Sequence, residues 1–203
     1  MSKSKEQFKA ELMETLTSTP DVSNEVLLAF EKLLIDQPND FFGKKSEVAH
    51  MTASSLVVND DLTEVLLTDH VKLKMWLQLG GHWCDFEEFP SKTPLQAAMK
   101  EVEEEGYGDK PTPQNILLEG RPLDLDVHNV GTHMHYDICF LTQVSKSIPV
   151  IVSKESNDVK WINIQNILEN EKQYDSRLVR MCQKVEDLKN NNTLTVIKSK
   201  IKP

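Results

Sequence analysis

Residues 92–108 read K-T-P-L-Q-A-A-M-K-E-V-E-E-E-G-Y-G, and this stretch predicts a helix of about three turns. Thr93 can cap the start of the helix, and Pro94 suits its first turn. Gln96 stands at the third helical position, where it completes a capping box with Thr93. The glycine at position 106 is expected to mark the end of the helix. The local signals therefore fix both ends of one helix.

Two faces of this helix differ in chemistry. Leu95, Ala98 and Val102 recur at helical spacing and form an apolar stripe that can lie on a sheet. Glu101, Glu104 and Glu105 are spaced i, i+3, i+4, so their carboxylates share another face. Like charges at this spacing repel, and a shared divalent cation with a preference for oxygen ligands, Mg²⁺ or Mn²⁺, would remove the conflict. A solvated acidic face is the alternative.

The preceding segment, 76–82, reads W-L-Q-L-G-G-H and predicts a short apolar strand that ends in a double glycine. Adjacent glycines such as Gly80 and Gly81 let a backbone approach phosphate groups closely. The order is therefore strand, glycine loop and acidic helix.

These residues resemble the signature of the Nudix hydrolase family. That signature is a Gly, five residues, a Glu, seven residues, and then Arg-Glu-apolar-x-Glu-Glu-x-Gly-apolar. Gly81 matches its first Gly, and residues 100–105, K-E-V-E-E-E, match its core. The resemblance to a bacterial subgroup extends over most of the chain, through residues 50–54, 76–82, 124–128, 133–137 and 155–161.

The resemblance implies an α/β/α sandwich with a mixed β-sheet, and it implies Mg²⁺ or Mn²⁺ bound by Glu101, Glu104, Glu105 and the Gly81 backbone. The catalytic base varies in the family and is sometimes a glutamate on a late loop. Glu155 lies in such a loop and is the first candidate, with a solvent-exposed loop acid as the alternative.

The sequence also departs from the family pattern. Eighteen residues separate Gly81 from Lys100, where the pattern has thirteen, which indicates a five-residue insertion within 82–91. Lys92 falls where the first Glu belongs, and Glu87 or Glu88 in the insertion is a candidate substitute. Lys100 replaces an Arg, and an ammonium lacks the planar fork of a guanidinium. Slow or altered activity is therefore an alternative.

Four polar residues alternate with apolar ones along 133–140, which predicts a strand with one polar face. His133 and His135 on this face are interpreted as lining the substrate pocket, with His135 or His133 contacting phosphate; a strand of hydrogen-bonded polar residues that is partly covered is one alternative. Gly80, Gly81, His82 and Lys100 complete the predicted substrate-binding set. A zinc site is another alternative for the His-x-His pair, joined by His128 or His82.

The net charge and the cysteine content of the chain indicate which binding partners are expected. The chain has 203 residues and a formal net charge of −9, which argues against nonspecific binding to nucleic acid polymers or to anionic membranes. Cys84, Cys139 and Cys182 are few and scattered, as expected for reduced thiols in a cytoplasmic protein. The expected partner is a small phosphoanhydride.

The apolar pattern and the resemblance together predict three parts. Residues 1–45 form an N-terminal helical hairpin that packs on the main domain, and a homodimer contact through it is an alternative. Residues 46–190 form the Nudix-type domain with a C-terminal helix over about 175–189. Residues 191–203 form a polar tail with frayed last residues.

The function implied by the resemblance is metal-dependent hydrolysis of a diphosphate bond in a nucleoside diphosphate derivative. Two alternatives remain. One is a catalytically weak domain that binds a nucleotide as a sensor, and the other is an isomerase of isoprenyl diphosphates, which needs a reactive cysteine.

Overall fold

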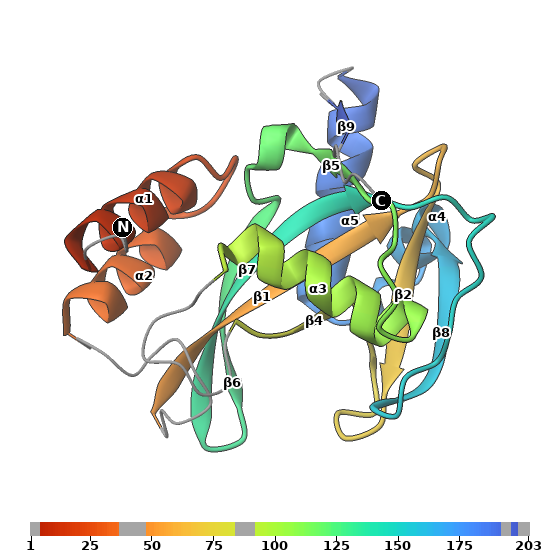
Figure 1. Cartoon of the computed structure of the whole chain (residues 1–203), viewed down its shortest axis with the longest axis horizontal. Helices are drawn as coiled ribbons and strands as arrows, with labels where there is room; N and C mark the ends of the chain where they lie inside the picture. Colours follow the sequence, from red (N-terminus) through yellow and green to blue (C-terminus); the bar gives the residue numbers. More distant parts are fainter. Residues whose placement is uncertain (1–4, 37–47, 84–91, 192–195, 199–203) are drawn as a thin grey trace.

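The computed structural model describes residues 5–36, 48–83, 92–191 and 196–198 of the chain, and its centre is a mixed β-sheet (Figure 1). Within these ranges nine strands belong to this sheet: β1 (Ala49–Val58), β2 (Glu64–His70), β3 (Trp76–Leu77), β4 (Leu79–His82), β5 (Asn115–Leu117), β6 (Asp124–Val130), β7 (His133–Gln143), β8 (Ser156–Asn163) and β9 (Val196–Lys198). The helices are α1 (Lys5–Thr17), α2 (Asn24–Asp36), α3 (Pro94–Tyr107), α4 (Ile164–Glu169) and α5 (Ser176–Asn190), with 3₁₀ turns at Leu118–Gly120 and Glu171–Gln173.

Strand β1 organises the sheet, and all ten of its residues are buried. It runs parallel to β7 along its whole length, from the pair Ala49–Met134 to the pair Val58–Gln143. On its other edge it pairs antiparallel with β4 and then with β2. Strand β6 returns antiparallel beside β7, and β8 lies beside β2. The central position of β1 places its side chains next to those of β4 and β7.

The two faces of the sheet are covered by different helices, as Figure 1 shows for α3 in front and α5 behind. Met51 and Ala53 of β1 pack in one cluster with the buried alanines of α3. Leu56 and Val58 pack in another cluster with Leu178 and Met181 of α5, among others. Side chains alternate along a strand, so these two sets point to opposite faces. The predicted mixed sheet with helices on both faces is confirmed.

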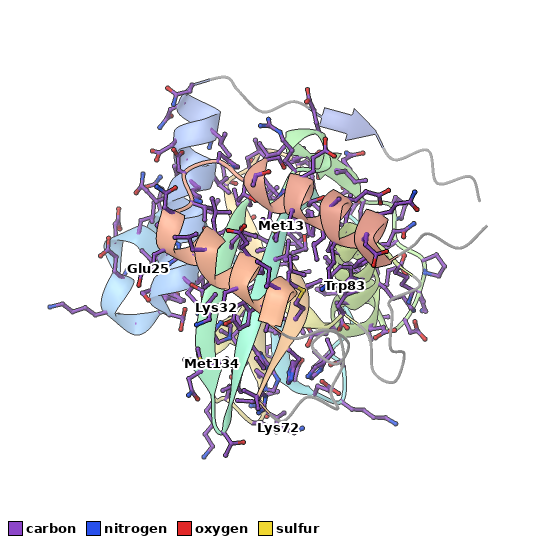
Figure 2. The ribbon with its side chains drawn as sticks, turned by 90° about the vertical axis from the view of Figure 1, so that its left-hand side faces the viewer. Met13, Glu25, Lys32, Lys72, Trp83 and Met134 are labelled. Atoms are coloured by element: carbon purple, nitrogen blue, oxygen red, sulfur yellow. The ribbon has the colours of Figure 1, made fainter. Side chains whose placement is uncertain are left out.

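The N-terminal hairpin packs on the sheet. Leu16 and Phe30 are fully buried, and the Phe30 ring meets the ring of Tyr136 edge-on at a centroid distance of 5.2 Å. Phe8 of α1 contacts Trp83, with centroids 5.6 Å apart, and Figure 2 shows α1 and α2 side by side on this side of the molecule. The hairpin is therefore present as predicted. The boundary between residues 45 and 46 falls outside the described residues and stays a prediction.

Two segments differ from the expected pattern. The single strand expected within 76–82 is divided into β3 and β4, because the chain changes partner from β2 to β1. Residues 196–198, expected in a polar tail, add strand β9 beside β5. None of the helices in the described residues is both long and apolar enough to span a membrane.

Candidate functional site

Helix α3 begins where its sequence predicts and ends close to the predicted position. The Thr93 side chain accepts a hydrogen bond from the Gln96 amide at 3.2 Å, and the Gln96 side chain accepts one from the Thr93 amide at 2.9 Å. Pro94 occupies the first turn, and Gly108 caps the C-terminus in a left-handed conformation with φ of 64°. The helix thus extends one residue beyond the glycine at position 106. The capping box therefore fixes the start of α3, and with it the positions of the acidic residues along the helix.

The packing of the apolar side of α3 on the sheet brings Glu101 and Glu105 close to β4. Ala98 and Val102 are fully buried against the sheet. As a result Glu105 is only 6% exposed, and its Oε2 accepts a hydrogen bond from the Gly80 amide at 2.8 Å. The Glu101 carboxylate lies against Gly81, where an added Cβ would come within 2.7 Å of it. The packing of one helix stripe therefore brings two carboxylates to the paired glycines.

Glu104 and Lys100 lie toward the outer side of the same helix. Glu104 is exposed, and one of its carboxylate oxygens is 3.3 Å from the Lys100 Nζ. Lys100 also contacts the carboxylate of Asp109. The Lys100 ammonium thus lies between the carboxylates of Glu104 and Asp109.

The glycines serve a different purpose from the one expected. They were predicted to form a loop, but Gly80 and Gly81 lie inside β4, opposite Ser54 and Ala53 of β1. A Cβ at Gly80 would be 2.3 Å from the Ser54 Cβ, so only a glycine fits between the two strands. The paired glycines therefore admit the close approach of Ser54 on one face and of the Glu101 carboxylate on the other.

A fourth acid comes near Glu105. Glu155 is an exposed residue just before β8, and its carbonyl accepts a hydrogen bond from the Val71 amide at 3.0 Å. Burial raises the pKa of Glu105 from 4.5 to about 7; the Gly80 hydrogen bond opposes this rise, and the negative charges of Glu155 and Glu104 add to it. The late-loop acid singled out in the sequence is thus close enough to act electrostatically on α3.

The raised pKa of Glu105 has a consequence for stability in the absence of metal. The pKa of this glutamate is 4.5 in the unfolded chain and about 7 in the folded one, so the folded state holds the proton over this interval. Stability in EDTA is therefore expected to fall as pH rises from about 4.5 to 7 and then to level off, with a total loss of about 3 kcal/mol.

Glu105→Gln removes this ionisation while keeping an acceptor for the Gly80 amide. In EDTA the variant is expected to be more stable than the wild type by about 2–3 kcal/mol above pH 7.5, and equal to it near pH 4.5. Urea unfolding at several pH values measures the difference. A wild-type protein that gains stability between pH 5 and 7 relative to the variant would contradict the burial of an uncompensated carboxylate.

A second group of polar side chains lies on the other face of the same strands. Successive residues of β4 point to opposite faces, so Gly81 faces α3 and His82 faces away from it. The His50 Nε2 atom is 3.0 Å from that of His82 and 2.8 Å from that of His135. The His133 Nε2 atom is 3.2 Å from that of His135. Four imidazoles from three strands therefore meet in one place, which we call the histidine cluster.

The cluster extends into a polar layer beneath α5. The ring of His128 lies edge-on to that of His135 at 5.4 Å, and its Nδ1 is 2.9 Å from an Asp126 carboxylate oxygen. Asp137 is buried and accepts hydrogen bonds from the hydroxyls of Thr52 and Ser54 at 2.7 and 2.6 Å. A small cavity beside it is lined by Gln78, Asp124, Asp126, Asp137, Cys139, Arg177 and Met181.

The predicted site residues thus fall into two groups. Glu101, Glu105 and Gly81 come together at α3, with Glu104 and Glu155 beside them, whereas His82, His133 and His135 lie on the opposite face. Glu87 and Glu88, the candidate substitutes for the acid replaced by Lys92, lie outside the described residues. No sequence pattern pointed to a site role for His50. The sequence shows that His50 alternates with Thr52 and Ser54 along one strand, but it does not show that this strand pairs with β7.

No family model and no curated protein sequence matches this chain. Solved structures do. A Nudix-family hydrolase from Clostridium perfringens is similar, with 23% identity, coverage of 68% of this chain and 97% of that one, and a TM-score of 0.53. A Caenorhabditis elegans Ap4A hydrolase in a binary complex is also similar, with 16% identity, coverage of 70% of this chain and 98% of that one, and a TM-score of 0.56. The Nudix domain of Shewanella oneidensis NrtR complexed with ADP ribose has 16% identity, coverage of 78% of this chain and 96% of that one, and a TM-score of 0.52.

At these identities the comparisons show the fold: the chain has the α/β fold of Nudix hydrolases, as expected from its sequence.

Proposed function

We propose that this protein hydrolyses the phosphoanhydride bond of a nucleoside diphosphate derivative, with a divalent cation, Mg²⁺ or Mn²⁺, held by carboxylates of α3. One observation carries the proposal: Glu101 and Glu105 meet at Gly80 and Gly81, with Glu104 and Glu155 next to them. The Nudix-hydrolase fold supports it, since such hydrolases act on this class of bond.

The residues present suit a hard cation. Every side-chain donor in this group is a carboxylate oxygen, the ligand type that Mg²⁺ and Mn²⁺ prefer. The group also holds more negative charge than positive, because Lys100 lies to one side, paired with Glu104 and Asp109. Burial is the main cause of the raised pKa of Glu105, the charges of Glu155 and Glu104 add to it, and a bound cation would lower this pKa.

When bound, the cation would offset the negative charge that develops on the diphosphate during hydrolysis. Glu101, Glu104, Glu105 and the Gly81 backbone hold it in this proposal. Water attacks one phosphorus atom, the bridging P–O bond breaks, and one proton of the water passes to a carboxylate base. We assign the base to Glu155, because it is exposed and its charge acts on Glu105.

The two other functions considered differ in what supports them. The nucleotide sensor is favoured by Lys92 and Lys100, which replace an acid and an arginine of the family pattern. The isomerase needs a reactive thiol, and burial raises the pKa of both Cys139 and Cys182. Neither of these two described thiols therefore suits that role.

A substrate panel tests the proposal. ADP-ribose, diadenosine tetraphosphate and nucleotide sugars are incubated with the protein in Mg²⁺ or Mn²⁺, and released nucleoside monophosphate or phosphate is measured. We expect hydrolysis of at least one compound that stops in EDTA and returns when the cation is added. Tight binding without turnover in either cation would overturn the hydrolase and support the sensor.

A further inference from the structure

The histidine cluster has the geometry of a metal site. One ring nitrogen from each of His50, His133 and His135 lies within 4.8 Å of the other two. The His82 Nε2 atom is 3.0 Å from that of His50, so it borders this triad. The three strands that carry the rings are held in fixed register, with His50 of β1 directly opposite His135 of β7. The arrangement is therefore built into the sheet, where β1 and β7 begin and β4 ends.

Protons alone satisfy this arrangement poorly. An imidazole nitrogen has either one N–H group or one lone pair. The His50 Nε2 atom contacts two other Nε2 atoms, those of His82 and His135, and the His135 Nε2 atom contacts those of His50 and His133. Any assignment of protons that makes all three contacts hydrogen bonds therefore makes one nitrogen serve two partners with a single hydrogen, and another serve two with a single lone pair. A central cation would instead take one lone pair from each ring.

Distances and donor type indicate which cation fits. Zinc–nitrogen bonds of about 2.0–2.1 Å in a tetrahedral site separate neighbouring nitrogens by roughly 3.3 Å. Three pairs of nitrogens in the cluster are 2.8–3.2 Å apart, so each of these pairs needs to spread by only a few tenths of an ångström, and the ring nitrogens of His50, His133 and His135 all lie within 4.8 Å of one another. Imidazole donors suit Zn²⁺ and other late transition metals, whereas Mg²⁺ prefers oxygen.

We propose that His50, His133 and His135 bind a divalent transition-metal ion of the Zn²⁺ class, with His82 as a fourth ligand. This site goes beyond the proposed hydrolysis and is separate from it. It lies on the face of β1 and β4 opposite to α3, and it uses nitrogen donors where the α3 group uses oxygen. His128, bonded to Asp126, supports the ring of His135 from the side.

Metal content is the first test, and it uses full-length protein without a histidine tag. Wild-type protein loaded with Zn²⁺ and passed over a desalting column is expected to keep about one zinc per chain by mass spectrometry. His50→Ala and His135→Ala are expected to weaken Zn²⁺ binding by at least about 100-fold, the upper end of the loss seen for supporting residues of metal sites. His82→Ala is expected to weaken it less than either of these.

Two control variants separate this site from others. His70→Ala removes the sixth histidine, whose Nδ1 accepts hydrogen bonds from the backbone amides of Lys72 and Leu73 and lies outside the cluster. Glu101→Gln removes an acid of α3. Both are expected to retain the zinc. Loss of the zinc in Glu101→Gln would assign the ion to the α3 acids and overturn the proposal.

A second measurement guards against variants that fail to fold. Zn²⁺ added to the apo protein is expected to raise the melting temperature of the wild type, because a ligand that binds only the folded state stabilises it. Folded His135→Asn protein is expected to show no rise in melting temperature when Zn²⁺ is added. The absorption spectrum of bound Co²⁺ should show nitrogen ligation in the wild type. Substoichiometric zinc in the wild type, or equal binding by the histidine variants, would overturn the site.

Discussion

Replacing Glu101 with glutamine is expected to lower metal-dependent turnover by roughly 10²–10³-fold, equivalent to about 3–4 kcal/mol of transition-state stabilisation. The Glu101 carboxylate lies against Gly81, and in the proposed function it is one of the charged donors to the cation. Glutamine keeps the size of the side chain but removes its charge. The fold should therefore survive while cation binding and catalysis weaken. Steady-state kinetics at saturating Mg²⁺, with thermal melting in parallel, measure both effects.

The matched control is Glu103→Gln on the same helix. The Glu103 carboxylate accepts a hydrogen bond from the Thr112 amide at 3.1 Å, so it points away from the α3 acids, and glutamine keeps that acceptor. Its turnover is expected to stay within about threefold of the wild type. Equal losses in the two variants would mean that the charge of the whole helix, and not the position of Glu101, sets the rate.

Replacing each of the two adjacent glycines with alanine is expected to affect a different property: stability for Gly80 and turnover for Gly81. In Gly80→Ala the new Cβ would meet the Ser54 Cβ at 2.3 Å and its Cα at 2.7 Å, so two paired strands must separate. A loss of about 3 kcal/mol follows, which lowers the melting temperature by about 10 °C. In Gly81→Ala the atoms nearest to the new Cβ belong to the end of the flexible Glu101 side chain, at 2.7 Å. This variant should melt within a few degrees of wild type but lose about 100-fold in turnover.

Gly131→Ala serves as the control for the glycine pair. It lies in the turn between β6 and β7 with φ of 67°, and nothing approaches its added Cβ within 4 Å. It is expected to cost about 1 kcal/mol from backbone strain and to leave turnover unchanged. A Gly81→Ala enzyme with wild-type activity would show that the position of the Glu101 carboxylate does not matter to the reaction.

Local signals account for what the sequence could predict. The capping box of Thr93 and Gln96, and the apolar spacing along the same helix, are properties of neighbouring residues, so α3 and its acidic face followed directly. The period-two pattern of 133–140 likewise gave the strand that carries His133 and His135. Together with the resemblance to the Nudix signature, these local elements indicated the fold class and one group of candidate residues.

Pairing between distant strands accounts for what was missed. The double glycine reads as a loop until β4 is paired with β1, and only that pairing shows that Ser54 and Glu101 need the space. The parallel register of β1 and β7 brings His50 against His135 across a separation of 85 residues. No periodicity within either segment carries this register, so the histidine cluster became visible only in three dimensions.

The position of a bound cation tests the central claim most directly. Crystals grown with Mn²⁺ would be measured by anomalous diffraction at the manganese absorption edge. We expect a manganese peak bounded by the carboxylates of Glu101 and Glu105 and by Gly81, and we expect it to disappear in Glu101→Gln. A manganese peak confined to the histidine cluster, with the α3 carboxylates turned toward solvent, would contradict the proposed hydrolase site.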